Sequence, residues 1–156
     1  MSAAARPWAL AGILCAVVVA ADQAVKARVE AGLTLGEEVD VLGPLSLTLT
    51  HNKGVAFGLA GGAGIGLVLV TVAALVLIAF VFSRDPGKPG LWVAVGLLAG
   101  GALGNLVDRL AAGEVTDYIH IGSWPAFNLA DIAITVGVVL IVLIYLRDAE
   151  PAGGDG

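Results

Sequence analysis

Asp117 lies in the connection between the last two long apolar segments of this chain, and Asp131 lies at the start of the last one. An acidic side chain at membrane depth is costly and normally marks an ion pathway, an ion pair or a catalytic carboxyl group. A simpler interpretation makes Asp117 a solvated loop acid and Asp131 an acid in the positively polarised first turn of a helix. The two aspartates are therefore the first candidates for carboxyl chemistry.

Further polar residues have helical spacing. Asp22 and Lys26 are four positions apart, so they share a helix face and can pair. Asn105, Asp108 and Arg109 converge on one face in the same way. Both groups can be purely structural, and a cation such as Arg109 near the C-terminus of a helix is favoured by the macrodipole.

Other chemistries find less support in the sequence. The serines have no neighbouring His or Lys that could activate them, and His51 and His120 stand alone rather than at metal-ligand spacing. Cys15 lies among apolar residues, which is typical of an inert buried thiol. We expect neither a metal ion nor an organic cofactor.

The composition places the elements that hold these residues in a membrane. Hydrophobic residues make up 58% of the 156 positions and charged residues only 13%, and the mean hydropathy is +0.96. A soluble domain of this size does not accommodate so much apolar surface. The net charge of −5, with eight Lys and Arg residues, excludes nucleic acid as a partner.

Four segments are long and apolar enough to span a bilayer as helices, and we predict one membrane domain built from them. Their ranges are about 8–28, 63–82, 91–110 and 128–146. A cleavable signal peptide is the alternative for the first, because small residues at 19–21 resemble a cleavage site. The glycine- and acid-rich end, 148–156, is predicted to be disordered.

The connections complete the predicted fold. Residues 45–50 alternate strictly between apolar and polar side chains, so the first connection, about 31–62, should form a small β-sheet at the membrane surface. The fold class is therefore mostly α, with four transmembrane helices and a sheet between the first two. Four spans place both termini on one side of the bilayer. The polar residues that then lie on the other side are Asp22, Lys26, Asn52, Asn105, Asp108, Arg109, Asp117, Asn128 and Asp131.

Five blocks of sequence, in this order and spacing, resemble the lipoprotein signal peptidases, the bacterial signal peptidase II family. They are Asp-Gln-x-x-Lys at 22–26, Asn-Lys-Gly-Val-Ala-Phe at 52–57, Gly-Asn-Leu-Val-Asp-Arg at 104–109, Val-Thr-Asp-Tyr-Ile at 115–119 and Phe-Asn-Leu-Ala-Asp at 127–131. The fourth block departs from the family pattern at Thr116 and Tyr118, where Val and Phe are more usual.

The resemblance implies an intramembrane aspartyl endopeptidase that cuts prolipoproteins immediately before their diacylglyceryl-modified cysteine. It implies that Asp117 and Asp131 are the catalytic pair, with water as the nucleophile and no cofactor. It also implies a set of supporting or substrate-contacting residues: Asp22, Lys26, Asn52, Gly54, Ala56, Phe57, Asn105, Asp108, Arg109, Asn128 and Ala130.

The expected location is the bacterial inner membrane, with both termini in the cytoplasm and the active site toward the outer leaflet. Lys and Arg are equally numerous on the two sides, but Lys26 and Arg109 report poorly on topology if they pair with acids of the site. Excluding them favours cytoplasmic termini, as the resemblance also implies.

Two rival functions remain. A small transporter or proton conductor would also line its pathway with intramembrane Asp, Asn and Arg, although the middles of the four spans are apolar apart from Thr71 and Thr135. An assembly scaffold packed through its glycines would explain the spans but not the acids gathered on one side.

Overall fold

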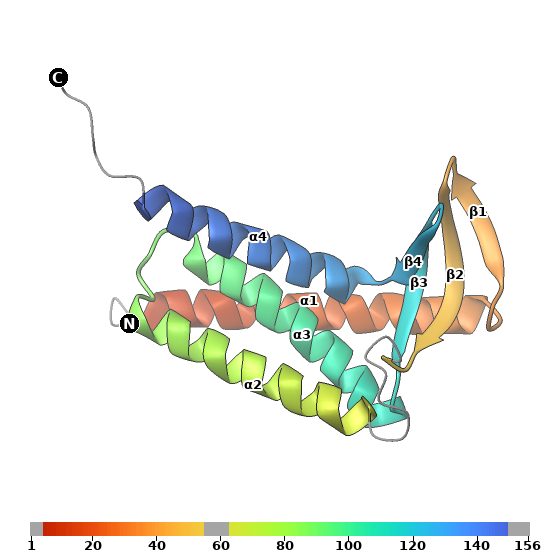
Figure 1. The fold of residues 1–156 in the computed structure, drawn as a ribbon, viewed down its shortest axis with the longest axis horizontal. Coiled ribbons are helices and arrows are strands. Elements are labelled where there is room, and N and C mark those ends of the chain that lie inside the picture. Colours follow the sequence, from red (N-terminus) through yellow and green to blue (C-terminus); the bar gives the residue numbers. More distant parts are fainter. Residues whose placement is uncertain (1–4, 55–62, 150–156) are drawn as a thin grey trace.

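The computed structural model describes residues 5–54 and 63–149. Within this part of the chain, four long helices form the body of the molecule and a small sheet lies at one end of them (Figure 1). The helices are α1 (Ala5–Gly32), α2 (Ala63–Arg84), α3 (Leu91–Ala112) and α4 (Leu129–Ala149). Each is long and apolar enough to cross a membrane. From position 150 onward, the tail predicted to be disordered lies outside the described residues.

The first apolar run is an integral helix of the bundle. α1 continues unbroken past residues 19–21, where a signal peptide would have been cleaved, and it packs along α3. Its side chains Asp22 and Lys26 are fully buried in that contact. The structure therefore favours a membrane span over a removable leader for this segment.

α3 packs against both α1 and α4, and glycine makes this close approach possible. A Cβ atom at Gly101 would lie 2.3 Å from the backbone oxygen of Ala130 in α4, and one at Gly100 would lie 2.7 Å from Cβ of Val18 in α1. Both distances are shorter than normal contacts between heavy atoms, so any larger residue would force the helices apart. This packing brings the polar ends of three helices together.

The sheet has four strands, and each pairs with the next in an antiparallel arrangement. They are β1 (Glu38–Leu42), β2 (Leu45–Asn52), β3 (Val115–Ile121) and β4 (Trp124–Phe127). The prediction of a small sheet is confirmed, but the prediction placed it in the first connection alone, whereas the second connection supplies β3 and β4. Residues 115–118 are all buried, so no alternation of polar and apolar side chains marks β3 in the sequence.

The pairing of β2 with β3 positions the site. Thr50 lies opposite Asp117, and Asn52 lies opposite Val115. The last residues of β2 therefore run beside the first residues of β3, at the end of the sheet next to α3. Two residues that are 65 positions apart in the chain, Asn52 and Asp117, become neighbours in this way.

The outer faces of the helices carry exposed apolar side chains, among them Leu69 and Val76 on α2 and Val139 on α4. A monomeric soluble protein rarely exposes apolar surface on this scale, whereas lipid covers it without cost. At the end of the bundle far from the sheet, Trp8 of α1 packs against Phe82 of α2, with ring centroids 4.6 Å apart and ring planes inclined by 59°.

Candidate active site

The start of α4 is fixed by residues from several elements. Three N–H groups of its first turn donate to side-chain oxygens: Leu129 to Tyr118 (3.2 Å), Ala130 to Asp22 (3.0 Å) and Asp131 to Asn128 (3.0 Å). The first N–H groups of a helix have no acceptor within the helix, so these bonds satisfy groups that would otherwise be unpaired. They also tie α4 to α1 and β3, which determines where Asp131 lies.

Asn128 and Asp131 form a reciprocal cap at this helix end. The side-chain oxygen of Asn128 accepts from the N–H of Asp131, and Oδ2 of Asp131 accepts from the N–H of Asn128 at 3.2 Å. The other carboxylate oxygen, Oδ1, accepts from Nδ2 of Asn105 at 2.8 Å. Both oxygens of the half-buried Asp131 therefore have a fixed donor.

Asp117 projects from β3 and is almost completely buried, with 3% of its surface exposed. Its Oδ1 accepts from Nδ2 of Asn128 at 2.7 Å, and its Oδ2 accepts from Nδ2 of Asn52 at 3.1 Å. The Asn52 amide is oriented by its own oxygen, which accepts from the N–H of Gly54 at 2.8 Å. Gly54 has a φ of 71°, a conformation that glycine adopts readily.

Burial raises the pKa of Asp117 from 3.8 to about 6. The negative charge of Asp131 also contributes to this raised pKa, while the hydrogen bonds from Asn52 and Asn128 act in the opposite direction. Asp117 therefore keeps its proton to a higher pH than an ordinary aspartate does. The charge of Asp131 thus changes the pKa of Asp117, as expected for two carboxyl groups that can act as an acid–base pair.

Two asparagine side chains connect the aspartates. Asn128 donates to Asp117 and also to Oδ1 of Asn105, at 3.1 Å. Asn105 in turn donates to Asp131. Because each amide has one oxygen and one NH₂ group, this chain of bonds settles which way both amides point.

A buried cluster of charged side chains contacts Asn105. Nζ of Lys26 lies 2.7 Å from Asp22, 2.6 Å from Asp108 and 3.1 Å from Oδ1 of Asn105. A lysine buried between two acids is compensated, whereas a single buried charge would be very costly. Since the oxygen of Asn105 faces Lys26, its NH₂ group must face Asp131.

The structure thus brings together most of the residues that the sequence analysis selected: Asp22, Lys26, Asn52, Gly54, Asn105, Asp108, Asp117, Asn128, Ala130 and Asp131. Arg109 is different, because its contact in the described part of the chain is with the backbone oxygen of Asn105, 3.5 Å away in the same helix. Ala56 and Phe57 lie outside the described residues.

Three participants were not selected from the sequence. Gln23 donates to Oδ1 of Asp108 at 2.8 Å, and Tyr118 accepts from the first N–H of α4. Thr116 donates to Glu30 at 2.6 Å, joining β3 to α1. Gln23 could have been found, because an amide directly after Asp22 at the end of an apolar span is itself unusual.

The histidines lie apart from the aspartates. His51 pairs with Glu114 at 2.8 Å and His120 pairs with Glu38 at 2.7 Å. Within residues 5–54 and 63–149, no three His, Cys, Asp or Glu side chains are grouped as a metal site.

An apolar groove opens beside Asp131. Its volume is about 310 Å³, and it is lined by Trp124, Phe127, Asp131, Ile132, Thr135 and Val136. A single carboxylate set in an apolar wall can meet an apolar chain that carries one polar group.

Comparison with known proteins points to one family. A family model described as signal peptidase (SPase) II matches residues 14–147. A lipoprotein signal peptidase of Pelotomaculum thermopropionicum is 44% identical over 141 residues, which cover 88% of this chain and 92% of that protein. The corresponding protein of Moorella thermoacetica is 39% identical, with 92% and 95% covered.

A solved structure agrees with the sequence comparisons. It is titled a bacterial membrane enzyme determined by the in meso method, and it superposes with a TM-score of 0.82 at 32% identity. The match covers 88% of this chain and 93% of the other. The chain therefore belongs to the signal peptidase II family, and it is a multi-pass membrane peptidase.

Proposed function

We propose that Asp117 and Asp131 are the catalytic pair of this peptidase, and that it cuts prolipoproteins immediately before a diacylglyceryl-modified cysteine. The enzymes of the family are lipoprotein signal peptidases, which remove signal peptides from prolipoproteins. The observation that carries the assignment of the pair is Asn128, which donates to Asp117 through its side chain and to Asp131 through its backbone N–H.

The environments of the two carboxyl groups suggest different roles. Asp117 is the more buried, and its raised pKa of about 6 suits the proton donor. Asp131 lies in the first turn of α4, is less buried than Asp117, and accepts hydrogen bonds from Nδ2 of Asn105 and from the N–H of Asn128. Asp131 is therefore the base, although the two groups titrate as a pair.

In the proposed reaction, Asp131 removes a proton from water as the water oxygen bonds to the scissile carbonyl carbon. Asp117 donates its proton to the carbonyl oxygen, which gives a neutral tetrahedral intermediate. The bond from carbon to nitrogen then breaks as the nitrogen takes the proton held by Asp131, and the intermediate returns one hydroxyl proton to Asp117. The pair ends in its starting protonation state.

The position of the site suits a substrate that is partly in lipid. Asp117 belongs to β3 and Asp131 to the first turn of α4. Figure 1 shows that this end of α4 lies next to the sheet, so water can reach the aspartates from outside the bilayer. The groove beside Asp131 is walled by α4 and β4 residues, which can receive the apolar signal peptide. With both termini in the cytoplasm, this end of the bundle would face the outer leaflet of the inner membrane.

The assay for the catalytic pair is processing of a tagged prolipoprotein that is co-expressed with wild type, Asp117→Asn or Asp131→Asn, followed by gel mobility. We expect each variant to accumulate the precursor while remaining inserted in the membrane. Asp40→Asn, which changes an exposed acid on β1, is the matched control and should process normally. Normal processing by both single variants would remove the assignment.

The orientation has a separate test. In a variant in which Cys15, the only cysteine, is replaced by Ala, single cysteines are introduced at Ser123 or at Gly87. Ser123 is exposed between β3 and β4, and Gly87 is exposed between α2 and α3. A membrane-impermeant maleimide applied to intact spheroplasts should label position 123 and leave position 87 unlabelled; the reverse pattern would refute the orientation.

A further inference from the structure

Asn52 is the last residue of strand β2, and its side chain donates to Asp117. In the β2–β3 ladder it lies opposite Val115, the first residue of β3. The end of a strand ladder opens more easily than its interior. Asn52 is also exposed, so water competes for its amide. A fixed hydrogen bond to Asp117 therefore needs support from outside the ladder.

The side chain of Glu114 contacts the residues on both sides of Asn52. Its Oε1 lies 2.8 Å from Nδ1 of His51, and its Oε2 lies 3.8 Å from Nζ of Lys53. Because a carboxylate can only accept hydrogen bonds, Nδ1 of His51 is the donor. The Lys53 side chain is 72% exposed and that of Glu114 only 22%, so the shorter contact with His51 is the stronger of the two.

Glu114 acts on the strand end from the face opposite the active site. Asn52 donates to Asp117, so both side chains point to one face of the strands. His51, the preceding residue, points to the other face, because side chains alternate along a strand. Among residues 5–54 and 63–149, no hydrogen bond or ion pair joins Glu114 to Asp117 or Asp131. Any influence of Glu114 on the aspartates must therefore pass through the strand.

The backbone on both sides of Glu114 is fixed. Gly113, the residue before it, has a φ of 80° and donates its N–H to the backbone oxygen of Arg109, which closes the end of α3. Val115, the residue after it, is buried and pairs with Asn52. The carboxylate of Glu114 therefore ties the end of β2 to the rigid end of α3.

We propose that Glu114 is a positioning residue, which holds the Asn52 amide on Asp117 by binding the two residues that flank Asn52. Its effect on cleavage rests on the proposed catalytic role of Asp117, but its effect on the hydrogen bond does not. The bond from Asn52 lowers the pKa of Asp117, so loosening the strand end should raise this pKa. A direct effect of charge has the opposite sign, because removing a nearby negative charge favours the ionised carboxylate.

The test uses the purified full-length protein and follows the infrared band of the protonated Asp117 carboxyl group, identified by its absence from Asp117→Asn. Glu114→Ala should raise the pH at which this band disappears, by part of the shift that Asn52→Ala produces. The value of kcat should fall about fivefold, the loss expected for one ordinary hydrogen bond, and KM should stay unchanged. An unchanged titration, or a shift to lower pH, would overturn the proposal. A shifted titration with unchanged cleavage would instead contradict the catalytic role of Asp117.

A double-variant cycle separates positioning from other effects of Glu114. The amide is already absent from Asn52→Ala, so adding Glu114→Ala should not move the titration of Asp117 any further. Additive shifts would show that Glu114 acts by another route and would refute the proposal. Glu114→Gln keeps an oxygen that can accept from Nδ1 of His51, so it should restore most of the wild-type titration. A titration equal to that of Glu114→Ala would contradict this contact.

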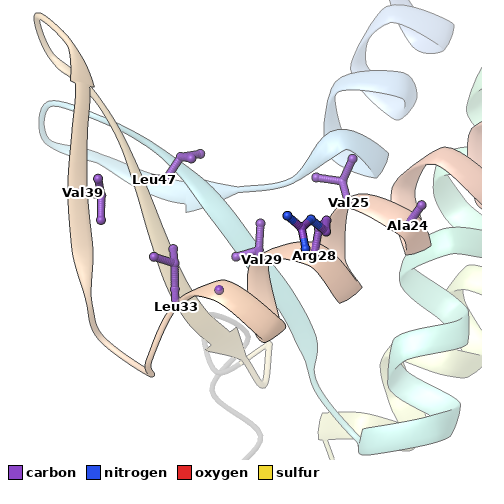
Figure 2. Close-up of a pocket in the computed structure, with 8 residues that line it drawn as sticks. Ala24, Val25, Arg28, Val29, Leu33, Val39 and Leu47 are labelled. Carbon is purple, nitrogen blue, oxygen red and sulfur yellow. The ribbon is translucent and has the colours of Figure 1, made fainter.

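Glu38 provides the matched control, because it makes the same type of contact elsewhere in the sheet. Its Oε1 lies 2.7 Å from Nδ1 of His120, which joins β1 to β3. The next residue, Val39, lines an apolar cavity between α1 and the strands β1 and β2 (Figure 2). Glu38→Ala should cost stability as Glu114→Ala does, yet leave the titration of Asp117 and kcat as in wild type. Equal shifts in both variants would rule out a specific role for Glu114.

Discussion

The carboxylate of Asp22 accepts a hydrogen bond from the backbone N–H of Ala130, a residue 108 positions later in the chain, at 3.0 Å. The same carboxylate pairs with Lys26 through its other oxygen. One buried side chain of α1 thus holds the first turn of α4 and orients the lysine that faces Asn105. Asp131 is placed by this contact, although Asp22 does not touch it.

Asp22→Ala should therefore reduce both stability and cleavage. The substitution leaves the Ala130 N–H without its acceptor and Lys26 with one carboxylate fewer. Removing one partner of a buried ion pair costs about 3–5 kcal/mol, and Asp108 will offset part of this. Thermal unfolding in detergent and the cleavage rate measure the two effects. Wild-type values for both would show that the contact is dispensable.

Substitutions of Asn128 should distinguish its role in capping α4 from its role beside Asp117. Asn128→Asp keeps an oxygen that can accept from the N–H of Asp131, so the helix cap should be retained. The fully buried side chain loses its donor to Asp117, Asn105 and the Thr116 backbone, so stability should fall by more than the roughly 1 kcal/mol typical of a deleted cap. The substitution replaces the NH₂ group that faces Asp117 by a third carboxyl oxygen, so cleavage should fall by more than about 100-fold. Asn128→Ala should lose both the helix cap and the cleavage activity. Cleavage that follows stability in the two variants would argue against a positioning role for the amide.

The pH dependence of cleavage should report Asp117. If Asp117 donates a proton, kcat/KM should fall as the pH rises above about 6, the pKa of this group. Because the ionised Asp131 raises that pKa, Asp131→Asn should move the titration of Asp117 to lower pH. The infrared band of the protonated carboxyl group follows this titration directly in both proteins. An unchanged titration in Asp131→Asn would mean that the two carboxyl groups are not coupled.

The raised pKa also has a consequence for stability. Folding favours the protonated form of Asp117, so its contribution to the free energy of unfolding is greatest below 3.8, the ordinary pKa, and is lost as the pH rises to about 6. Asp117→Asn removes the titrating group, and its stability should depend less on pH in this interval. Denaturation of wild type and Asp117→Asn at several pH values tests whether the free energy of unfolding of wild type falls more steeply as the pH rises.

Asn52 should shift the same titration in the opposite direction. Its hydrogen bond to Oδ2 of Asp117 favours the ionised carboxylate and lowers the pKa. Asn52→Ala should therefore raise the pKa of Asp117 above its value in wild type and extend cleavage to higher pH. A shift to lower pH in this variant would contradict the assigned hydrogen bond.

A pair of glycines tests the packing of α3 on α4. Gly101→Ala places a methyl group 2.3 Å from the backbone oxygen of Ala130, so the first turn of α4 must move, and both the melting temperature and the cleavage rate should fall. Gly12→Ala is the matched control, because nothing lies within 4 Å of its added Cβ. It should be neutral or slightly stabilising.

Local patterns in the chain are enough to predict the membrane class, the approximate helices and most polar residues of the site. These features are local: an apolar run of about 20 residues is visible in the chain, and a carboxylate within it is conspicuous because burying it is costly. The motif blocks also mark Asp117 and Asp131 as the expected catalytic pair.

How these residues meet depends on contacts between distant parts of the chain. The β2–β3 register that brings Asn52 to Asp117 joins segments 65 positions apart, and strand β3 carries no alternation because residues 115–118 are all buried. The direction of the Asn105 and Asn128 amides depends on donors from other elements. Such contacts arise from long-range packing, so no local pattern in the chain could have specified them.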